Sequence, residues 1–267
     1  MEERSILEHY ASGSERDRLA GGTSRIKFAR TKELLQRVLP GPPANVLDVG
    51  GGPGAYASWL AGLGYRVHLV DPVPLHVEQA TETARGSTEP YTAAVGDARR
   101  LDHEDGSFDA VLMLGPLYHL TERSDRVGAL AEARRVVRPR GMVAGAAISR
   151  FASLFDGLAS GFLGDPAFDG IVERDLLDGQ HRNPTDRTEW FTTAYFHHPD
   201  ELPREMRDAG LVPDSVLGIE GPGWLVRDAW DDPARRDHVL RAARAVEAEP
   251  TLLGLSAHLL VVGRRPS

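Results

Sequence analysis

The fold of this chain is decided by the stretch "NVLDVGGGPGAY", residues 45–56. Its first part, 46–49, has the apolar character of a buried strand and runs straight into the glycine-rich turn 50–54. Glycines permit a tight turn and let a ligand approach the backbone, because no side chain stands in the way. A helix is expected to follow from Ala55. Strand, glycine turn and helix together predict a ligand-binding loop.

Two classes of cofactor fit this loop taken alone. Gly50, Gly52 and Ala55 match the G-x-G-x-x-A fingerprint of dinucleotide-binding proteins, which would imply a nicotinamide-dependent oxidoreductase. That reading lacks further support, because no tyrosine of the chain is followed by lysine four residues later, as a Tyr-x-x-x-Lys catalytic pair requires. Other features of the sequence must therefore decide the cofactor.

Composition excludes several classes of function. The 267 residues carry 31 Lys and Arg against 39 Asp and Glu, and no long basic run is present, so nucleic acid is not an expected partner. The absence of cysteine excludes disulfides, thiolate nucleophiles and sulfur-ligated metals. No secretory signal or membrane-spanning apolar run is recognised. We expect a cytoplasmic protein that does not associate with a membrane, as a monomer or a homodimer.

Continuous apolar runs alternate with helical patterns over the first part of the chain. Such runs, bounded by turn residues, are typical of parallel strands covered by helices on both faces. The pattern predicts a doubly wound, Rossmann-like α/β domain, preceded by a helix over 25–39 that Pro40 ends. The expected strands are 45–49, 66–71, 91–97, 108–115 and 141–149.

The regular pattern stops after Ser149, where an insertion begins. Apolar stripes at helical spacing occupy 151–162 and 168–177. They predict either amphipathic helices packed on the sheet domain or a mobile cap, 151–180, over a bound acceptor. A helix within 198–210 and strands at 213–221 and 256–265 follow. The chain is thus divided into an N-terminal helical segment over the cofactor site (1–40), a cofactor-binding sheet core (41–150), a helical cap or substrate insertion (151–198), and a C-terminal helix with the last strands (199–267).

Three carboxylates narrow the choice of cofactor. Asp48 lies in a strand that a dinucleotide enzyme normally keeps apolar, and an acid there suits a ligand with a cationic group. Asp71 ends the second expected strand, where it can accept hydrogen bonds from ribose hydroxyls in either cofactor class. Asp97, within "GDA", can accept a hydrogen bond from an adenine amino group, or alternatively serve as a helix cap in a simple turn.

The order and spacing of these motifs resemble class I S-adenosylmethionine-dependent methyltransferases. In particular "VLDVGGGPGAYASWLAGLGYRVHLVD", followed by "LGPLYHL" at 114–120, looks like a broad bacterial group of small-molecule methyltransferases. The resemblance runs from about Asn45 to Ser149. It implies a seven-stranded, mostly parallel sheet whose last strand is antiparallel, with S-adenosylmethionine as cofactor. The N-P-P-Y tetrapeptide of nucleic-acid amino methylases is absent.

The resemblance also implies roles for individual residues. An N-terminal segment that folds over the cofactor in related enzymes would bring Tyr10 and Arg18 to the methionine carboxylate; an ordinary surface helix is the alternative. Asp48 would face the cationic part of the cofactor. The remaining positions are Gly50, Gly52 and Gly54 for the methionine portion, Asp71 with Pro72 for the ribose, Asp97 with Ala98 for the adenine, and Leu114 for the adenosyl group.

The expected reaction is methyl transfer to an oxygen, nitrogen or carbon atom of a small, fairly hydrophobic metabolite. In-line displacement needs no protein nucleophile, and a base helps only where the acceptor is protonated. His119 is the expected base, with His197 and His198 as alternatives, and no metal is expected. A non-catalytic S-adenosylmethionine-binding protein is the alternative. The acceptor pocket is expected to be aromatic, with Trp190, Phe191, Tyr195, Phe196 and Trp224 in its walls.

Overall fold

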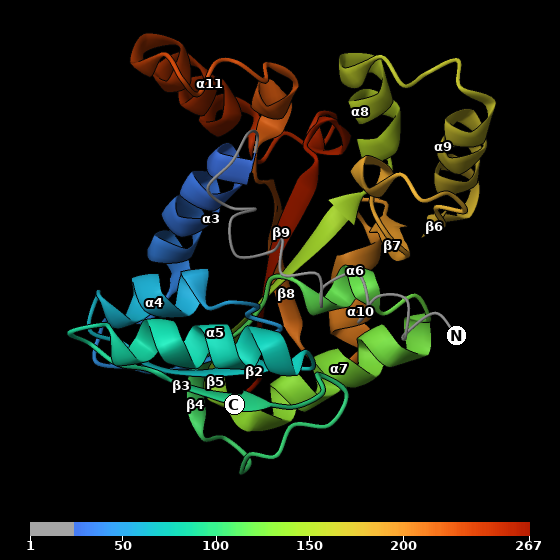
Figure 1. The fold of residues 1–267 in the computed structure, drawn as a ribbon. Coiled ribbons are helices and arrows are strands. Elements are labelled where there is room, and N and C mark those ends of the chain that lie inside the picture. Colours follow the sequence, from blue (N-terminus) through green and yellow to red (C-terminus); the bar gives the residue numbers. More distant parts are fainter. Residues whose placement is uncertain (1–23) are drawn as a thin grey trace.

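Seven strands form the centre of a nine-stranded sheet (Figure 1). The computed structural model describes residues 24–267, so the predicted contacts of Tyr10 and Arg18 lie outside the described part. The strand order is β3-β2-β1-β4-β5-β9-β8. The strands are β1 Asn45–Val49, β2 Arg66–Asp71, β3 Thr92–Val95, β4 Phe108–Met113, β5 Val137–Ser149, β8 Val212–Gly218 and β9 His258–Arg264.

Among these seven central strands, one runs against the others. β9 lies between β5 and β8 and is antiparallel to both, while β1 to β5 pair in parallel. The sheet with an antiparallel last strand is therefore confirmed. β1 pairs with β2 on one side and with β4 on the other, so the chain reverses its direction of winding at β1. In open α/β sheets a ligand binds at such a switch point, outside the carboxyl ends of the strands.

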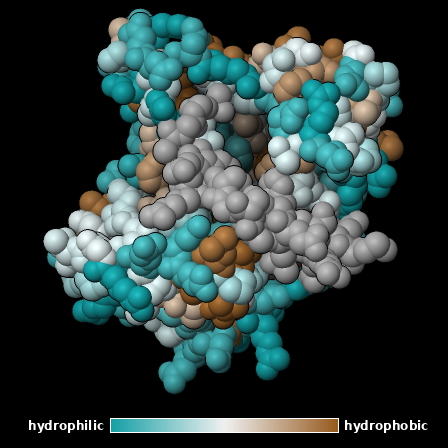
Figure 2. Space-filling view, in the orientation of Figure 1, coloured by the Kyte–Doolittle hydropathy of each residue, from teal (hydrophilic) through white to brown (hydrophobic). Residues whose placement is uncertain are grey.

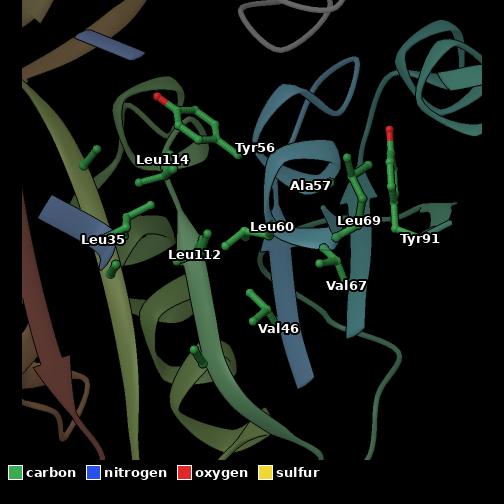
Figure 3. Close-up of a cluster of buried hydrophobic side chains, with 14 of the residues drawn as sticks. Leu35, Val46, Tyr56, Ala57, Leu60, Val67, Leu69, Tyr91, Leu112 and Leu114 are labelled. Carbon is green, nitrogen blue, oxygen red and sulfur yellow. The ribbon is translucent and has the colours of Figure 1, made fainter. Parts of the chain in front are cut away.

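Helices cover both faces of the sheet, because successive side chains of a strand point to opposite faces. Val46 and Leu112 belong to the core under α3, α4 and α5, part of which Figure 3 shows. Leu47 and Met113, their neighbours in sequence, belong to the core under α7 and α10. The helices are α3 Ser24–Val38, α4 Ala55–Ala61, α5 Pro74–Arg85, α7 Arg123–Val136 and α10 Glu201–Asp208.

The insertion after β5 contains the two predicted helices and an unpredicted pair of strands. α8 is Ala152–Ser160 and α9 is Pro166–Asp178, followed by β6 Gln180–His181, the 3-10 helix η1 Thr188–Trp190 and β7 Ala194–His197. β7 pairs in parallel with the last two residues of β5, beyond the end of β4, and β6 pairs with β7. The second half of the insertion is thus strand and loop. Its strands are too short to give an alternating pattern in the sequence.

The C-terminal part covers one end of the sheet together with α3. η2 Gly221–Leu225 and α11 Pro233–Val246 pack on each other, and η3 Leu253–Leu255 leads into β9. In Figure 1, α3 and α11 stand on one side of the open end of the sheet, and α8 and α9 stand on the other. Among residues 24–267, no helix has the length and apolar character needed to cross a bilayer.

A buried ion pair joins the two helices on the α7 and α10 face. Arg126 of α7 and Glu205 of α10 are 1% and 2% exposed. Nε and Nη2 of Arg126 donate to Oε1 of Glu205 at 2.9 and 2.8 Å. Nη1 donates to the carbonyl oxygens of Leu120 and Thr121, both at 2.9 Å. Arg126 therefore also holds the chain where it leaves "GPLYHL".

Removing this guanidinium is expected to destabilise the protein strongly. Arg126→Met removes the guanidinium that pairs with buried Glu205, leaving His197 as the remaining side-chain partner, and removes a donor from the Leu120 carbonyl. We expect a loss of ~3–5 kcal/mol in the free energy of unfolding. Arg123→Met is the matched control, because Arg123 also reaches from α7 to α10 but pairs with Asp208 between half-exposed side chains. That change should cost less than about 1 kcal/mol. Urea unfolding measures both, and equal losses would contradict the prediction.

Candidate functional site

The backbone N–H groups of the glycine turn donate hydrogen bonds to the end of β2. Gly50 N donates to Val70 O at 2.7 Å, and Gly52 N donates to Oδ2 of Asp71 at 2.9 Å. Gly54 has a φ of 91°, a left-handed conformation that glycine adopts most easily. A Cβ on Gly52 would meet no atom of the described residues within 4 Å. The loop therefore leaves an open space above Gly52 at the switch point of the sheet.

Asp71 uses most of the acceptor positions of its carboxylate to hold the loop. Besides Gly52 N, its carboxylate accepts from Val73 N at 2.9 Å and lies 3.0 Å from Nδ1 of His76, both through Oδ1. A carboxylate has about four acceptor positions, so one remains for a ligand hydroxyl. Asp71 is 4% exposed. It thus combines a structural role in the loop with the capacity predicted for it.

Asp48 is a buried acid without a partner. It is 1% exposed, and within the described residues its Oδ2 has no hydrogen-bond partner. Burial and the nearby charge of Asp71 raise the pKa of Asp48 to about 7. The buried hydroxyl of Tyr91 is also without a partner, and burial with the charge of Asp48 raises its pKa to about 12. This side of the loop is arranged to receive a positive charge.

The raised pKa of Asp48 predicts a pH-dependent cost in stability. The protonated carboxyl stabilises the fold fully below its ordinary pKa of 3.8, and this contribution is lost as the pH rises to about 7. Asparagine resembles the protonated form. The advantage of Asp48→Asn in free energy of unfolding should therefore grow by on the order of 2–3 kcal/mol between pH 5 and pH 8. Urea titrations at both values test this, and a constant difference would contradict it.

The other predicted cofactor residues surround the same edge of the sheet. Asp97 is a partly exposed acid whose carboxylate accepts hydrogen bonds from the backbone and guanidinium of Arg99, and these bonds lower its pKa. Ala98 and Leu114 are 8% and 7% exposed and belong to opposite cores of the sheet. Pro72 is exposed beside Asp71. The carboxylate of Asp97 is thus hydrogen-bonded to Arg99, an interaction that was not predicted from the sequence.

A short helix carries the chain from this loop to a cavity. α6 Pro116–His119 follows β4, and a Cβ on Gly50 would lie only 2.8 Å from Cδ of Pro116. A Cβ on Gly115 would lie 3.1 Å from the carbonyl oxygen of Gly50. Tyr118, two residues after Pro116, lines the cavity. The glycine turn and the cavity are therefore joined by direct contact through α6.

The cavity has a volume of about 210 Å³ and lies between α3, α8, η1 and η2. Figure 2 shows the hollow between the part formed by α3 and α11 and the part formed by α8 and α9. Tyr195 was predicted to line it, but its ring stacks instead on the guanidinium of Arg126, 3.7 Å away. Alternate residues of a strand point to opposite faces, which separates Tyr195 from its neighbours. The aromatic walls are Tyr118, Phe168, Trp190, Phe191, Phe196 and Trp224.

The predicted histidines lie in three different environments. The ring of His119 packs against Tyr118 and Phe191, with centroids 4.7 and 5.9 Å away. His197 is fully buried with Nε2 3.2 Å from Oε2 of Glu205, whereas His198 meets the ring of Phe151. Adjacent His197 and His198 thus diverge. Between residues 24 and 267 no three His, Asp or Glu side chains gather closely enough to hold a metal ion.

Sequence comparison agrees with this arrangement. Residues 46–141 match the model of a methyltransferase domain family. Over this segment the chain is similar to methyltransferases. An uncharacterized methyltransferase of Bacillus subtilis, YodH, is 32% identical over 44% of this chain and 49% of its own. A ubiquinone biosynthesis O-methyltransferase of Methylocella silvestris is 34% identical over 42% of each chain. These alignments span less than half of each relative.

Solved structures share the fold across most of the chain. A putative methyltransferase bound to the Trm112 activator of Haloferax volcanii superposes with a TM-score of 0.63 and 20% identity, covering 97% of this chain and 98% of that one. The [4+2]-cyclase SpnF superposes with a TM-score of 0.55 and 18% identity, covering 88% and 80%. Methyltransferase relatives and a cyclase thus have the same architecture. The fold by itself therefore does not determine the reaction.

Proposed function

We propose that this protein transfers a methyl group from S-adenosylmethionine to an oxygen, nitrogen or carbon atom of a small, fairly hydrophobic metabolite. The observation that carries the proposal is the direct contact between two sites of opposite character. One is the glycine turn with its unpartnered acid Asp48, and the other is the aromatic cavity beyond α6. A donor held on the loop would therefore adjoin an acceptor held in the cavity.

The residues of the loop suit this cofactor. S-adenosylmethionine carries ammonium and sulfonium charges and no pyrophosphate, and Asp48 supplies a buried carboxylate whose Oδ2 has no hydrogen-bond partner within residues 24–267. The space above Gly52 leaves room beside the backbone, and Asp71 keeps an acceptor position for a ribose hydroxyl. When bound, the cofactor supplies a methyl group already activated on sulfur. What remains for the protein is to bind the cofactor and the acceptor, to align them and to exclude water.

The lining of the cavity supports a small, fairly hydrophobic molecule as the acceptor. Six aromatic side chains contribute to its walls, and an enclosed space of this size suits a compact molecule better than a polymer. His119 lies at the end of α6, beside Tyr118, and its action as a base on an acidic acceptor stays a prediction. A weakly basic amine would need no base. The protein's part in the reaction is therefore chiefly the placement of the acceptor next to the loop.

Cofactor binding gives the first test. S-adenosylmethionine and S-adenosylhomocysteine should raise the melting temperature, whereas NAD(H) should not, because only a ligand of the native state stabilises it. Asp71→Ala should weaken binding of S-adenosylhomocysteine by ~1.5–3 kcal/mol through lost hydrogen bonds to a charged group. Calorimetry on folded variants measures the loss. Stabilisation by NAD(H) alone would overturn the proposal, and unchanged affinity in Asp71→Ala would overturn the ribose assignment.

Removal of the cap segment tests its role. A linker can join its two ends, because the side chain of Arg150 reaches Gly179: a Cβ on Gly179 would be 2.8 Å from Nε of Arg150. Replacing residues 151–178 by a short Gly-Ser linker should leave S-adenosylhomocysteine binding measurable, because the loop is untouched. Transfer of label from methyl-labelled S-adenosylmethionine to a bacterial metabolite extract should be lost with the wall formed by α8 and α9.

A matched control lies on the same helices. Leu177 of α9 is 79% exposed, so Leu177→Ser should change neither cofactor binding nor label transfer. The two measurements on the excised protein separate folding from function, because retained binding demonstrates an intact sheet domain. Full label transfer without residues 151–178 would contradict the role of this segment as a cap over the acceptor.

A further inference from the structure

A buried carboxylate and a histidine stand side by side in the wall of the cavity. Glu220, 2% exposed, precedes η2, and His258 begins β9. Oε1 of Glu220 lies 2.7 Å from Nδ1 of His258. Oε2 accepts hydrogen bonds from the backbone N of His258 and from Oγ of Ser256, both at 3.0 Å. The carboxylate thus fixes both the backbone and the ring of His258.

The charge state of Glu220 determines the tautomer of this histidine. Burial by itself raises the pKa of Glu220, but the charge and hydrogen bond of His258, together with the charge of Lys27, hold that pKa below its usual value. Glu220 is therefore ionised at neutral pH. A carboxylate beside Nδ1 keeps the proton of a neutral imidazole on that nitrogen, so the lone pair is on Nε2. Such a ring accepts a proton readily.

The pair lies next to the segment that links the cavity to the glycine turn. Glu220 and His258 line the cavity together with Tyr118. The ring of Tyr118 meets that of His258 edge to face, with centroids 6.4 Å apart. Tyr118 belongs to α6, whose first residue, Pro116, approaches Gly50. An acceptor in the cavity would therefore have the cofactor loop and this histidine at neighbouring walls.

We propose that His258, oriented by Glu220, is the general base for an acceptor with an acidic hydroxyl on a flat phenolic or enolic group. This inference rests on the proposed methyl transfer and assigns it to oxygen. The acceptor O–H proton moves to Nε2 of His258, the oxygen electron pair bonds to the methyl carbon, and the C–S pair stays on sulfur. The proton then leaves His258 for solvent. Glu220 is a positioning residue.

The walls of the cavity support a flat acceptor of this kind. Phe168, Trp190 and Phe191 contribute large rings that favour contact with another ring. Lys27, which is 5% exposed, adds a cation to the same wall, and a cation favours the ionised form of a hydroxyl. A weakly basic amine, which is already neutral, would need no base.

Ionisation of a bound phenol tests the proposal without turnover. The probe is 4-nitrophenol, whose phenolate absorbs visible light, added to the full-length protein saturated with S-adenosylhomocysteine. The wild-type protein should raise the ratio of phenolate to phenol by about tenfold over free probe at the same pH, the effect of one charged hydrogen bond. His258→Gln should lose this increase while its affinity for S-adenosylhomocysteine stays unchanged.

The pH dependence of methyl transfer to 4-nitrophenol separates positioning from mere structural support. The charged and titratable groups around the pair are Lys27 of α3, Tyr118 of α6, Asp156 of α8 and Glu189 of η1, and they stay unchanged in every variant. Loss of the carboxylate in Glu220→Gln lowers the pKa of His258, so the acidic limb of kcat/KM should move to lower pH as the maximum rate falls. If Glu220 only supported the structure, Glu220→Gln would lower the rate and leave the acidic limb of kcat/KM at the same pH.

Controls and contrary outcomes are well defined. His68→Gln alters a histidine of β2 that bonds to Thr92 and does not line the cavity, so it should behave as wild type. The proposal is overturned if 4-nitrophenol does not bind, if His258→Gln keeps the ionisation, or if the effect is lost in His119→Asn but not in His258→Gln. Absence of S-adenosylhomocysteine binding in the wild-type protein would instead overturn the proposed function itself.

Discussion

The arrangement of this protein depends on the close approach of two turns at the carboxyl ends of β1 and β4. Pro116 sits where a side chain on Gly50 would have to be, and Gly115 approaches the carbonyl oxygen of Gly50 almost as closely. Any side chain at Gly50 would separate the turns. Because α6 starts at this contact and its Tyr118 forms part of the cavity wall, the contact sets the distance between the loop and the cavity.

The two sides of this contact differ in how their buried charges are satisfied. On the loop side, Asp48 is enclosed without a hydrogen-bond partner for Oδ2 among the described residues, and burial makes its ionised form costly. A cationic ligand would relieve that cost. On the cavity side, Glu220 is just as buried, but both of its oxygens have partners in His258 and Ser256. The loop side can therefore bind a positively charged ligand, whereas on the cavity side a residue of the protein itself already binds the carboxylate of Glu220.

Much of the fold and part of the site could be predicted because they depend on local sequence. The strands of the core, the glycine turn and the helices of the insertion each show their own periodicity or turn residues. β6 and β7 could not be predicted, since two-residue pairing at the end of β5 has no periodic signal. Tyr195 was assigned to the wrong face, because the start of a short strand sets which residues point inward.

The sequence by itself determined the doubly wound sheet and the acids beside the glycine turn, because apolar runs, glycine spacing and strand ends are properties of neighbouring residues. The antiparallel last strand followed only from the resemblance to a known family. Only the tertiary structure decided what those acids bind. Asp71 turned out to hold the loop, and Asp97 to pair with Arg99. The pairing of Glu220 with His258 joins residues far apart in the chain. Such a pair arises from the register of β8 and β9, which no local pattern encodes.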